Sequence, residues 1–597
     1  MKVDNIKQKT TKELKEVAGE IRQFLIENVP QNGGHFASNL GVVELSLALH
    51  KVFNTPDDSI VFDVGHQSYT HKILTGRKEV LLNKRANGGI SGFPRLDESY
   101  HDSFGVGHSS TSISAALGIA RAKKLKGDET HTIAVIGDGA LTGGLAFEAL
   151  NNLKKEDNNL IIVLNDNEMS ICKNVGAYSR YLTKFRTHPF YISFKQAIDF
   201  SLNRIPLIGH GLARFAFRFK EVIRTILMPT TIFEKMGIGY IGPIDGHNLN
   251  ELISAMERAK KFNCPVMIHA LTVKGKGFTD AEKEPTSYHA VYPKVASQLV
   301  NTSDLLERIV CEVAEADEKI VVVDAAMSKG LGLTEFAKAF PERFFDVGIA
   351  EGHAVTFAAG LATKGFRPIV ALYSSFAQRA YDQILHDVAL QNLPITFMFA
   401  SCGLDKCGET HHGIFDLSYT SNMPNLSIFA PSSAEQMEDM FRYSLSLNAP
   451  CVIRYPKELL AKTVPFVPNK AQVVQKGDDI TILSVGDMLE TSRQVASNLR
   501  GYSVEIIDIQ SVRPMDIENI KKSLEKTNFA ITLENGMKQN GAGALIANSF
   551  CEYSIYNFGY DCDRFPGFET AETYGLTPEN IADFIKSKIK LEVKKYA

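Results

Sequence analysis

Two short polar motifs, Gly137-Asp138-Gly139 and Asn165-Asp166-Asn167, contain residue types that suit the binding of a metal ion together with phosphate. A carboxylate and an amide oxygen are ligands for a hard cation such as Mg²⁺, which also holds phosphate oxygens. The glycines let backbone N–H groups approach a pyrophosphate at the start of a helix. The alternative is that Asp138 merely caps a helix.

The elements around these motifs must bring them together. The apolar runs 133–136 and 160–164 precede the two motifs, and a helical pattern lies between the runs. This order predicts a βαβ unit of a parallel sheet. Because ligands of such sheets bind at the carboxyl ends of the strands, we expect Asp138 and Asn167 to meet there.

Histidines next to glycine occur at three further places, Gly34-His35, Gly65-His66 and Gly107-His108. The second follows a predicted strand at 60–64, and the third opens an Ala-rich helix. A single histidine is more often structural than functional. Three of them at the ends of predicted elements are harder to dismiss as residues of the hydrophobic core.

The rest of the chain repeats the same alternation. Strand-like runs at 319–324, 369–376 and 480–486 are separated by helical patterns, which predicts further parallel sheets. A chain of 597 residues is also too long for one hydrophobic core. We therefore expect an α/β protein with three doubly wound sheet domains, parallel sheets flanked by helices, over residues 1–301, 302–465 and 478–597.

Composition excludes several classes of function. The net charge of −3 gives no basic face for nucleic acid. The eight cysteines are scattered without the paired spacing of a metal site. The first residues lack an apolar signal core, and no run approaches a membrane span. These features predict a soluble cytoplasmic protein with reduced thiols and no membrane partner.

Residues 173–230 have a different texture, with basic side chains interleaved with Phe and Tyr. A basic, aromatic helix can lie on a membrane or on a partner. Long insertions in compact domains are more often lids or binding loops. We therefore favour a mobile cover over the site for this segment.

Several motifs together resemble those of the transketolase superfamily: Gly33-Gly34-His35, Asp63-Val64-Gly65-His66-Gln67, Gly107-His108-Ser109-Ser110 and Gly137-Asp138-Gly139. Within it, segments 240–248, 274–278 and 288–291 are similar to the 1-deoxy-D-xylulose-5-phosphate synthase family, and the similarity runs essentially from end to end. This resemblance implies a transketolase-type fold, thiamine diphosphate and Mg²⁺ as cofactors, and a homodimer. It also implies that the cofactor lies between the first two domains of one chain.

The resemblance implies a role for individual residues of this sequence. The implied catalytic residues are Glu351, His35, His289, His411, Tyr373 and Arg379. The implied cofactor contacts are His66, Gly107, His108, Ser109, Gly139, Ala140, Asn167, Phe278, Glu351 and Phe376. The implied Mg²⁺ ligands are Asp138, Asn167 and the backbone carbonyl of Met169.

The implied reaction is a transfer that joins pyruvate to glyceraldehyde 3-phosphate, giving 1-deoxy-D-xylulose 5-phosphate and CO₂. This product is a precursor of isoprenoids, thiamine and pyridoxal. The cofactor stabilises the carbanion that forms when CO₂ leaves. Glu351 matches a glutamate that hydrogen-bonds the aminopyrimidine ring, although a helix N-terminus also favours glutamate. Proton transfer on the substrate oxygens points to the histidines.

Two positions depart from the family pattern. An arginine that follows the strand at 395–399 in the family falls on Ser401, and a second arginine falls on Lys457. The intervening loop is one residue short, so that a family aspartate becomes Cys407 or, shifted in register, Asp405. Both arginines normally grip the acceptor phosphate, and neither serine nor lysine reproduces their planar fork. We therefore expect weak use of glyceraldehyde 3-phosphate.

These departures leave several functions open. One is the synthase with divergent phosphate contacts, and another is a pyruvate-dependent carboligase with a different, possibly unphosphorylated, aldehyde. A catalytically silent binding subunit is disfavoured by Asp138, Asn167 and Glu351. A transketolase that moves a two-carbon unit is disfavoured by segments 242–247 and 288–291.

Overall fold

The computed structural model describes residues 3–83, 90–169, 175–186, 231–292, 298–561, 563, 567 and 571–596. It divides into two compact units, each of which is considered by itself. Unit 1 comprises Met1–Lys84 with Gly89–Pro293, and unit 2 comprises Arg85–Gly88 with Lys294–Ala597. No helix among the described residues is both long enough and apolar enough to span a membrane.

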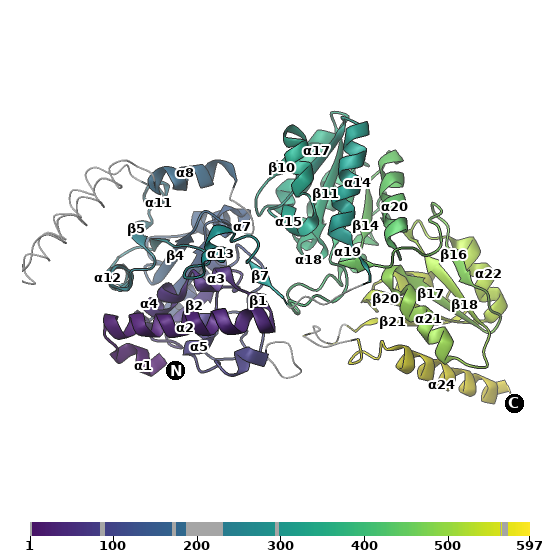
Figure 1. Cartoon of the computed structure of the whole chain (residues 1–597), viewed down its shortest axis with the longest axis horizontal. Helices are drawn as coiled ribbons and strands as arrows, with labels where there is room; N and C mark the ends of the chain where they lie inside the picture. The colour runs from purple at the N-terminus through teal and green to yellow at the C-terminus, as the bar shows by residue number, and fades with distance from the viewer. Residues whose placement is uncertain are drawn as a thin grey trace, which may run out of the picture. The chain divides into compact units, whose positions relative to one another are not determined.

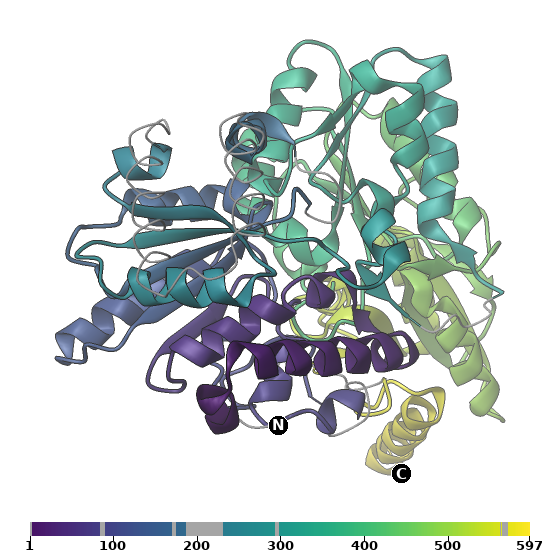
Figure 2. The same ribbon diagram turned by 60° about the vertical axis from the view of Figure 1, so that its left-hand side comes forward.

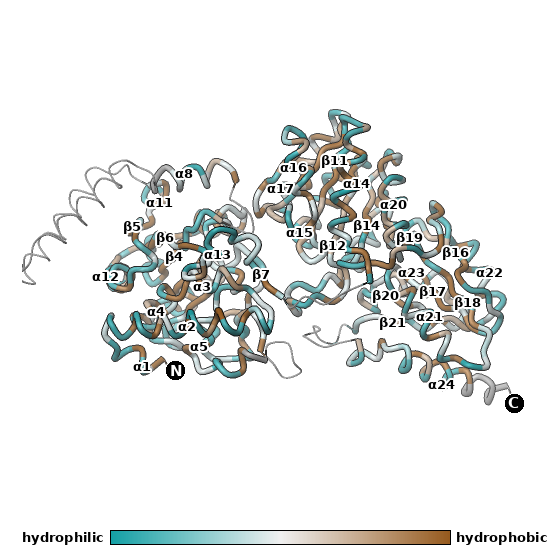
Figure 3. The backbone as a smooth tube through the Cα atoms, in the orientation of Figure 1, coloured by the Kyte–Doolittle hydropathy of each residue, from teal (hydrophilic) through white to brown (hydrophobic). Residues whose placement is uncertain are grey.

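Unit 1 is built on a parallel five-stranded sheet with the strand order β2-β3-β4-β6-β5. Its strands are β2 (Ser59–Phe62), β3 (Thr132–Gly137), β4 (Leu160–Asp166), β5 (Gly239–Asp245) and β6 (Val266–Leu271). The three central strands are almost wholly buried, as expected for a sheet covered on both faces. Their apolar character is visible in Figure 3, for example along β4.

Helices cover both faces of this sheet (Figures 1 and 2). The helices α2 (Thr11–Asn32), α4 (Val43–Val52) and α12 (Leu249–Ala259) share one core with alternate residues of the strands, such as Ile133 and Val135. The helices α6 (Ser112–Leu125) and α7 (Gly144–Asn151) pack against each other. The strand residues between those of the shared core therefore face α6, which contacts β2, β3 and β4.

Short elements at the edges of the sheet complete unit 1. A two-stranded antiparallel ribbon joins β1 (Gly34–His35) to β7 (Ala290–Val291). The short helices are α1 (Val3–Gln8), α3 (Ala37–Leu40), α5 (Tyr69–Leu74), η1 (Val80–Asn83), η2 (Ala140–Thr142), α8 (Gly176–Arg186), α11 (Ile232–Lys235) and α13 (Thr279–Lys283).

The first sheet of unit 2 has seven strands in the order β10-β9-β11-β12-β14-β13-β19. They are β9 (Ile320–Asp324), β10 (Phe344–Asp346), β11 (Arg367–Tyr373), β12 (Thr396–Ala400), β13 (Ser427–Phe429), β14 (Cys451–Arg454) and β19 (Ser511–Arg513). All pairings are parallel except β13 with β19. Its principal helices are α14 (Thr302–Ala316), α17 (Glu351–Ala362), α20 (Ala434–Ser446) and the π-helical η5 (Gln383–Ala389).

The smaller helices and strands beside this sheet are α15 (Ser328–Leu331), α16 (Thr334–Ala339), η3 (Pro341–Arg343), α18 (Ser374–Ala377), η4 (Gln378–Ala380), α19 (Asp416–Thr420), and the strand pair β8 (Val300–Asn301) and β15 (Glu458–Leu459).

The second sheet of unit 2 has five strands in the order β16-β18-β17-β20-β21. They are β16 (Gln472–Gln475), β17 (Ile480–Val485), β18 (Val504–Ile509), β20 (Phe529–Met537) and β21 (Ser554–Tyr560), with β16 antiparallel to its neighbour. The helices are η6 (Gly486–Met488), α21 (Leu489–Asn498), α22 (Ile517–Thr527), α23 (Ala542–Ser549) and α24 (Pro578–Tyr596). One apolar core includes Ile428 of β13 in the first sheet and Leu483 of β17 in the second.

The predicted α/β class with helix-flanked parallel sheets is confirmed, with two antiparallel edge strands added. One boundary differs from the prediction: the strand expected at 369–376 ends at Tyr373, where α18 begins. The predicted cover at 173–230 lies mostly outside the described residues, which include only α8 and its immediate surroundings.

Candidate active site

The predicted site residues fall into two groups, one in each unit. In unit 1, three histidine rings form a triangle. The ring centroids of His35 and His66 lie 5.5 Å apart, and each lies 5.4 Å from that of His289. The β1–β7 ribbon places His289 beside His35, because His35 pairs with Ala290. The three histidines thus form one cluster despite their distance in sequence.

Asn39 fixes the backbone of two of these histidines and was not predicted as a site residue. Its side-chain amide donates to the carbonyl oxygens of His35 at 2.9 Å and His66 at 2.7 Å. Its Oδ1 accepts from the backbone N–H of Tyr69 at 2.8 Å, and the Tyr69 hydroxyl accepts from the backbone N–H of His35 at 3.1 Å. Both residues are fully buried, so they act as a rigid internal brace.

The turn after β2 requires glycine at Gly65. Its φ is +85°, and a Cβ there would lie 2.6 Å from Pro94 and 2.5 Å from Val106. This close approach brings the segment that carries Pro94 and Val106 against the turn that carries His66. The neighbouring Phe93 ring lies 5.5 Å from His35.

Asp63 and Ser110 connect the other predicted cofactor contacts. The buried Asp63 carboxylate accepts from the backbone N–H groups of Ser110 at 2.8 Å and Ser112 at 3.1 Å. Ser110 in turn donates from its hydroxyl to the carbonyl of Ala140 at 2.7 Å. The loop with Gly107, His108 and Ser109 is therefore held beside the turn with Gly139 and Ala140. Asp63 and Ser110 belong to motifs recognised in the sequence, but their roles emerge only from these contacts.

Asp138 and Asn167 follow neighbouring parallel strands, as predicted, because Gly137 of β3 pairs with Asn165 of β4. Asp138 is only 3 % exposed, and burial together with the neighbouring Asp166 carboxylate raises its pKa well above its usual range. Asp166 itself contacts the buried His269 ring nitrogen at 2.7 Å. The backbone N–H of Met169 donates to the Asn167 side-chain oxygen at 3.1 Å.

The oxygen atoms of the predicted metal ligands fit the implied Mg²⁺ ion. A buried carboxylate beside a second carboxylate has negative charge that a divalent cation would balance. Asp138, Asn167 and the carbonyl of Met169 are all hard oxygen ligands. Among the described residues there is no group of three or more His, Cys, Asp or Glu side chains suited to a metal ion. The predicted ligand set does not require such a group, because Asp138 is the only one of these residue types in it.

His247, in a segment similar to the synthase family, positions the loop that ends at Phe278. Its Nε2 accepts from the backbone N–H of Val273 at 2.9 Å, so its Nδ1 carries the proton toward Glu44 at 3.1 Å. Arg22 binds the same Glu44 carboxylate through two hydrogen bonds. Phe278 packs its ring 5.4 Å from that of Phe36, the residue after His35.

In unit 2, Glu351 stands at the first position of α17 and is 7 % exposed. The guanidinium of Arg379 lies 3.8 Å from its carboxylate. Burial raises the pKa of Glu351, and Arg379 opposes the rise. A buried glutamate with a raised pKa can share a proton with a ring nitrogen near neutral pH. The structure therefore brings these two predicted residues together.

Tyr373, Phe376 and His411 form a second aromatic group in unit 2. The Tyr373 and Phe376 rings stack at 5.6 Å, and the His411 ring meets Phe376 edge-on at 5.5 Å. Tyr373 ends β11 and Phe376 lies on α18, so the strand-to-helix turn creates the stack. Burial raises the pKa of the Tyr373 hydroxyl, which keeps it protonated as a hydrogen-bond donor.

A cavity of about 190 Å³ in unit 2 contains both positions that depart from the family pattern. Its lining includes Tyr373, Ser401 and Lys457, together with Ser303 at the start of α14. The Lys457 ammonium lies 2.5 Å from Asp405. The sequence left Asp405 and Cys407 as alternatives for the family aspartate, and the structure shows Asp405 in contact with Lys457.

Residues from the C-terminal part of the chain contact the strand β14 and the loop after Ser401. The buried Arg454 donates to Asp416 at 2.8 Å and to the Asn535 side-chain oxygen at 2.7 Å. Asn535 donates in turn to Asp487 at 2.5 Å. A Cβ at Gly403 would lie 3.1 Å from the Asn535 amide nitrogen, so this residue abuts the loop after Ser401. The sequence showed no such role for residues beyond 478.

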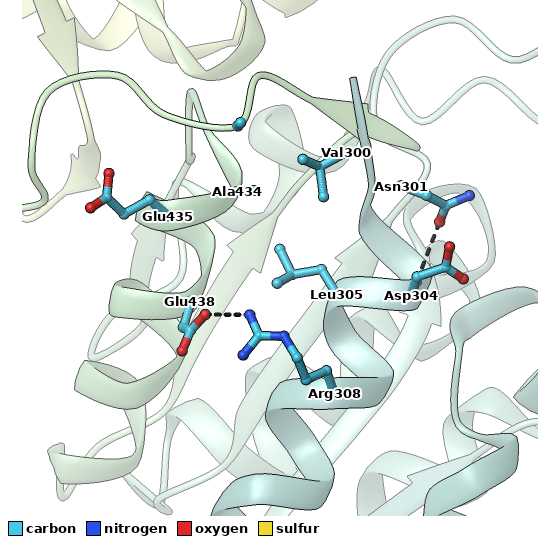
Figure 4. A pocket seen from close by; sticks show the side chains of 9 residues that line it. Val300, Asn301, Asp304, Leu305, Arg308, Ala434, Glu435 and Glu438 are labelled. Atoms are coloured by element: carbon cyan, nitrogen blue, oxygen red, sulfur yellow. Dashed lines mark hydrogen bonds and ion pairs between the residues drawn. The ribbon is translucent and has the colours of Figure 1, made fainter. Parts of the chain in front are cut away.

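A second, larger cavity of about 480 Å³ lies between α14 and α20 (Figure 4). None of the predicted site residues lines it. Arg308, the one basic side chain among its described lining residues, binds Glu438 at 2.6 Å. The predicted chemistry therefore does not belong to this cavity.

Comparison with protein families matches three parts of the chain. Residues 1–272 match the family model described as 1-deoxy-D-xylulose-5-phosphate synthase. Residues 298–463 match the transketolase pyrimidine binding domain, and residues 469–586 match the transketolase C-terminal domain.

Curated relatives of high coverage carry the same description. A 1-deoxy-D-xylulose-5-phosphate synthase of Syntrophomonas wolfei is 46% identical over 92% of this chain and 89% of its own length. One from Caldanaerobacter subterraneus is 44% identical over 98% of both chains. One from Pelotomaculum thermopropionicum is 47% identical over 91% of this chain and 88% of its own length. Among solved structures, a transketolase of Campylobacter jejuni aligns with a TM-score of 0.43 at 18% identity, over 97% of this chain and 100% of its own.

Proposed function

Because this chain belongs to the 1-deoxy-D-xylulose-5-phosphate synthase family, we propose that the two groups of residues described above carry out the reaction of that family. The chain is a transferase of transketolase type, and its fold is of that type. It condenses pyruvate with glyceraldehyde 3-phosphate to 1-deoxy-D-xylulose 5-phosphate and CO₂, a step of isoprenoid synthesis. A carboligase with another aldehyde is not favoured by these relatives.

The transketolase-type domains imply dependence on thiamine diphosphate. When bound, this cofactor supplies a centre that stabilises the carbanion left by loss of CO₂ from a 2-oxo acid. Asp138, Asn167 and the Met169 carbonyl would hold Mg²⁺ beside its pyrophosphate. Gly107, His108, Ser109, Gly139 and Ala140 would surround the same end of the cofactor, and their support comes from the Ser110 and Asp63 contacts.

Glu351 would accept or donate the hydrogen bond to the aminopyrimidine ring, with Arg379 tuning its protonation. His35, His66 and His289 would hold or transfer protons at the substrate oxygens. The single observation that supports this most strongly is the triangle of their rings, because imidazole side chains can donate or accept a proton near neutral pH. Phe278 and Phe376 would contact the cofactor, and Tyr373 and His411 would contact the substrates.

The assignment is tested with purified protein supplied with thiamine diphosphate and Mg²⁺. Pyruvate and glyceraldehyde 3-phosphate should give equal amounts of CO₂ and 1-deoxy-D-xylulose 5-phosphate, measured by gas analysis and mass spectrometry. Product formation only from an unphosphorylated aldehyde would contradict the assignment. Bound cofactor without turnover of pyruvate would instead identify a silent subunit.

The division at 1–301, 302–465 and 478–597 is also proposed, and the three sheets and the three matched segments support it. A homodimer and a cytoplasmic location complete the proposal. Light scattering of an active sample should give about twice the chain mass of 65.9 kDa. A mass near that of one chain would contradict the dimer.

A further inference from the structure

The cavity beside Tyr373 and Ser401 has one strongly basic side chain among its ten described lining residues, Lys457. The remaining polar groups there are hydroxyls and an amide. An anionic group that entered the cavity would therefore depend on Lys457 for charge. A lysine offers a point charge but not the planar fork of an arginine.

Lys457 can bind an anion only in competition with Asp405, which already forms an ion pair with it. The Lys457 ammonium lies 2.5 Å from one Asp405 oxygen, and the backbone N–H of Cys407 donates to the other at 2.8 Å. The Asp405 backbone N–H donates to His412 at 2.8 Å. The Asp405 side chain is 4 % exposed, whereas that of Lys457 is 54 % exposed. The carboxylate is therefore the buried partner and the ammonium is the exposed one.

The charge states of this pair are stable at neutral pH. Burial raises the pKa of Asp405, but Lys457 outweighs it and lowers the pKa below its usual value. Burial lowers the pKa of Lys457, and Asp405 outweighs it in the opposite direction. Both groups stay ionised, so their charges cancel at the wall of the cavity. An anion that approaches Lys457 must also approach the Asp405 carboxylate.

We propose that Asp405 determines the charge preference of this enzyme for its acceptor aldehyde, by holding Lys457 and repelling a phosphate in the cavity. The inference rests on the proposed function, because it takes the cavity to receive the end of the acceptor distant from the aldehyde. A neutral acceptor meets no such opposition, since Tyr373 and Ser401 supply hydroxyls. Asp405 acts through Lys457 and is a specificity-determining residue.

The test compares the parent with Asp405→Asn, an isosteric change that removes the charge. The KM for glyceraldehyde 3-phosphate should fall about three- to tenfold, the range of a partly exposed ion pair. The KM for D-glyceraldehyde and the KM for pyruvate should stay within a factor of about two. Inorganic phosphate should inhibit the variant at a lower concentration than the parent. This inhibition reports anion binding separately from turnover.

A double-mutant cycle with Lys457→Gln checks the route of the effect. The benefit of Asp405→Asn should vanish in the double variant, because no cation remains to be released. Glu435→Gln is the matched control: it breaks the exposed Lys462–Glu435 pair at 2.9 Å in the same unit, outside this cavity. It should leave both acceptors unchanged.

An unchanged or increased KM for glyceraldehyde 3-phosphate in Asp405→Asn would overturn the inference. If that variant does not fold, Lys457→Gln decides, because it should raise the KM for the phosphorylated acceptor and not for the neutral one; an equal change for both would overturn it. Failure of the proposed function is a different result: the parent itself would form no 1-deoxy-D-xylulose 5-phosphate.

Discussion

The ring of His35 lies 5.4 Å from the ring of His289, a residue at the far end of unit 1 in sequence. The pairing of β1 with β7 makes this contact, and the Phe36 N–H donates to the His289 carbonyl at 3.0 Å. The histidine cluster is therefore held by backbone hydrogen bonds rather than by side chains alone. Substitutions of residues beside the cluster should change the positions of the histidine rings without unfolding the protein.

Asn39→Ala tests the brace beneath the cluster. It removes the hydrogen bonds to the carbonyls of His35 and His66 and leaves buried groups unsatisfied, at a cost of about 1–3 kcal/mol in stability. We expect kcat/KM to fall about ten- to a hundredfold while the folded protein persists. Steady-state kinetics with circular dichroism measures both. Asn152→Ala, which loses one exposed hydrogen bond to Glu148, is the control and should behave like the parent.

Asp138→Ala should lose affinity for thiamine diphosphate, because Asn167 and a carbonyl alone give too little charge to hold Mg²⁺ against a pyrophosphate. Titration calorimetry with Mg²⁺ and cofactor measures this loss directly. Removal of Mg²⁺ from the parent with a chelator should have the same effect. The exposed Asp57→Ala is the control. Equal affinity in parent and Asp138→Ala would mean that the metal lies elsewhere.

Glu351→Ala should lower the turnover rate by about a hundredfold or more. The variant should retain the fold and cofactor binding. The reason is that Glu351 is buried at the start of α17, where its carboxylate lies 3.8 Å from Arg379 and can share a proton with a ring nitrogen. Glu335→Ala, an exposed glutamate in the first turn of α16, serves as control. Near-normal activity of Glu351→Ala in a steady-state assay would remove this residue from the proposed mechanism.

Glu534 should make stability depend on pH. Burial raises its pKa from 4.5 to about 7, although the N–H groups of Gly543 and Ala542 oppose the rise. The folded state therefore keeps a proton that the unfolded chain releases at lower pH. This contribution, about 3 kcal/mol, is present below pH ~4.5 and is lost as the pH rises through about 7.

Glu534→Gln removes that titration, so the free energy of unfolding should change less between pH 5 and pH 8 than in the parent. Urea denaturation at several pH values measures the difference, and the exposed Glu525→Gln is the control. Parallel curves for parent and Glu534→Gln would show that Glu534 does not titrate in this range.

The strands, and the positions of Asp138 and Asn167 at the ends of neighbouring strands, were predictable because their signals are local. Apolar runs followed by Gly-Asp-Gly or by Asn167 mark strand ends, and parallel pairing then brings those ends together. The sequence also singled out His35 and His66 as candidate site residues, because each follows a glycine at the end of a predicted element. Their arrangement with His289 was expected only from the family resemblance, because a two-residue ribbon has no sequence pattern of its own.

Other features could not be predicted because they depend on contacts between residues that are distant in sequence. Asn39, Asp63 and Asn535 act through tertiary hydrogen bonds, which leave no periodicity in the sequence. The pair of Lys457 with Asp405 depends on how a shortened loop folds.

The strand β19 has a consequence for any attempt to divide the gene. It comes from the segment after β18 yet pairs with β13, and the core containing Ile428 and Leu483 continues across the same junction. A fragment that stopped before β16 would expose the β13 edge and the few residues of that core that precede β16, such as Ile428. Such an open edge recruits other chains. Separately expressed pieces of unit 2 should therefore aggregate unless they are produced together, whereas a cut in the chain near residue 293 would leave both sheets of unit 2 intact.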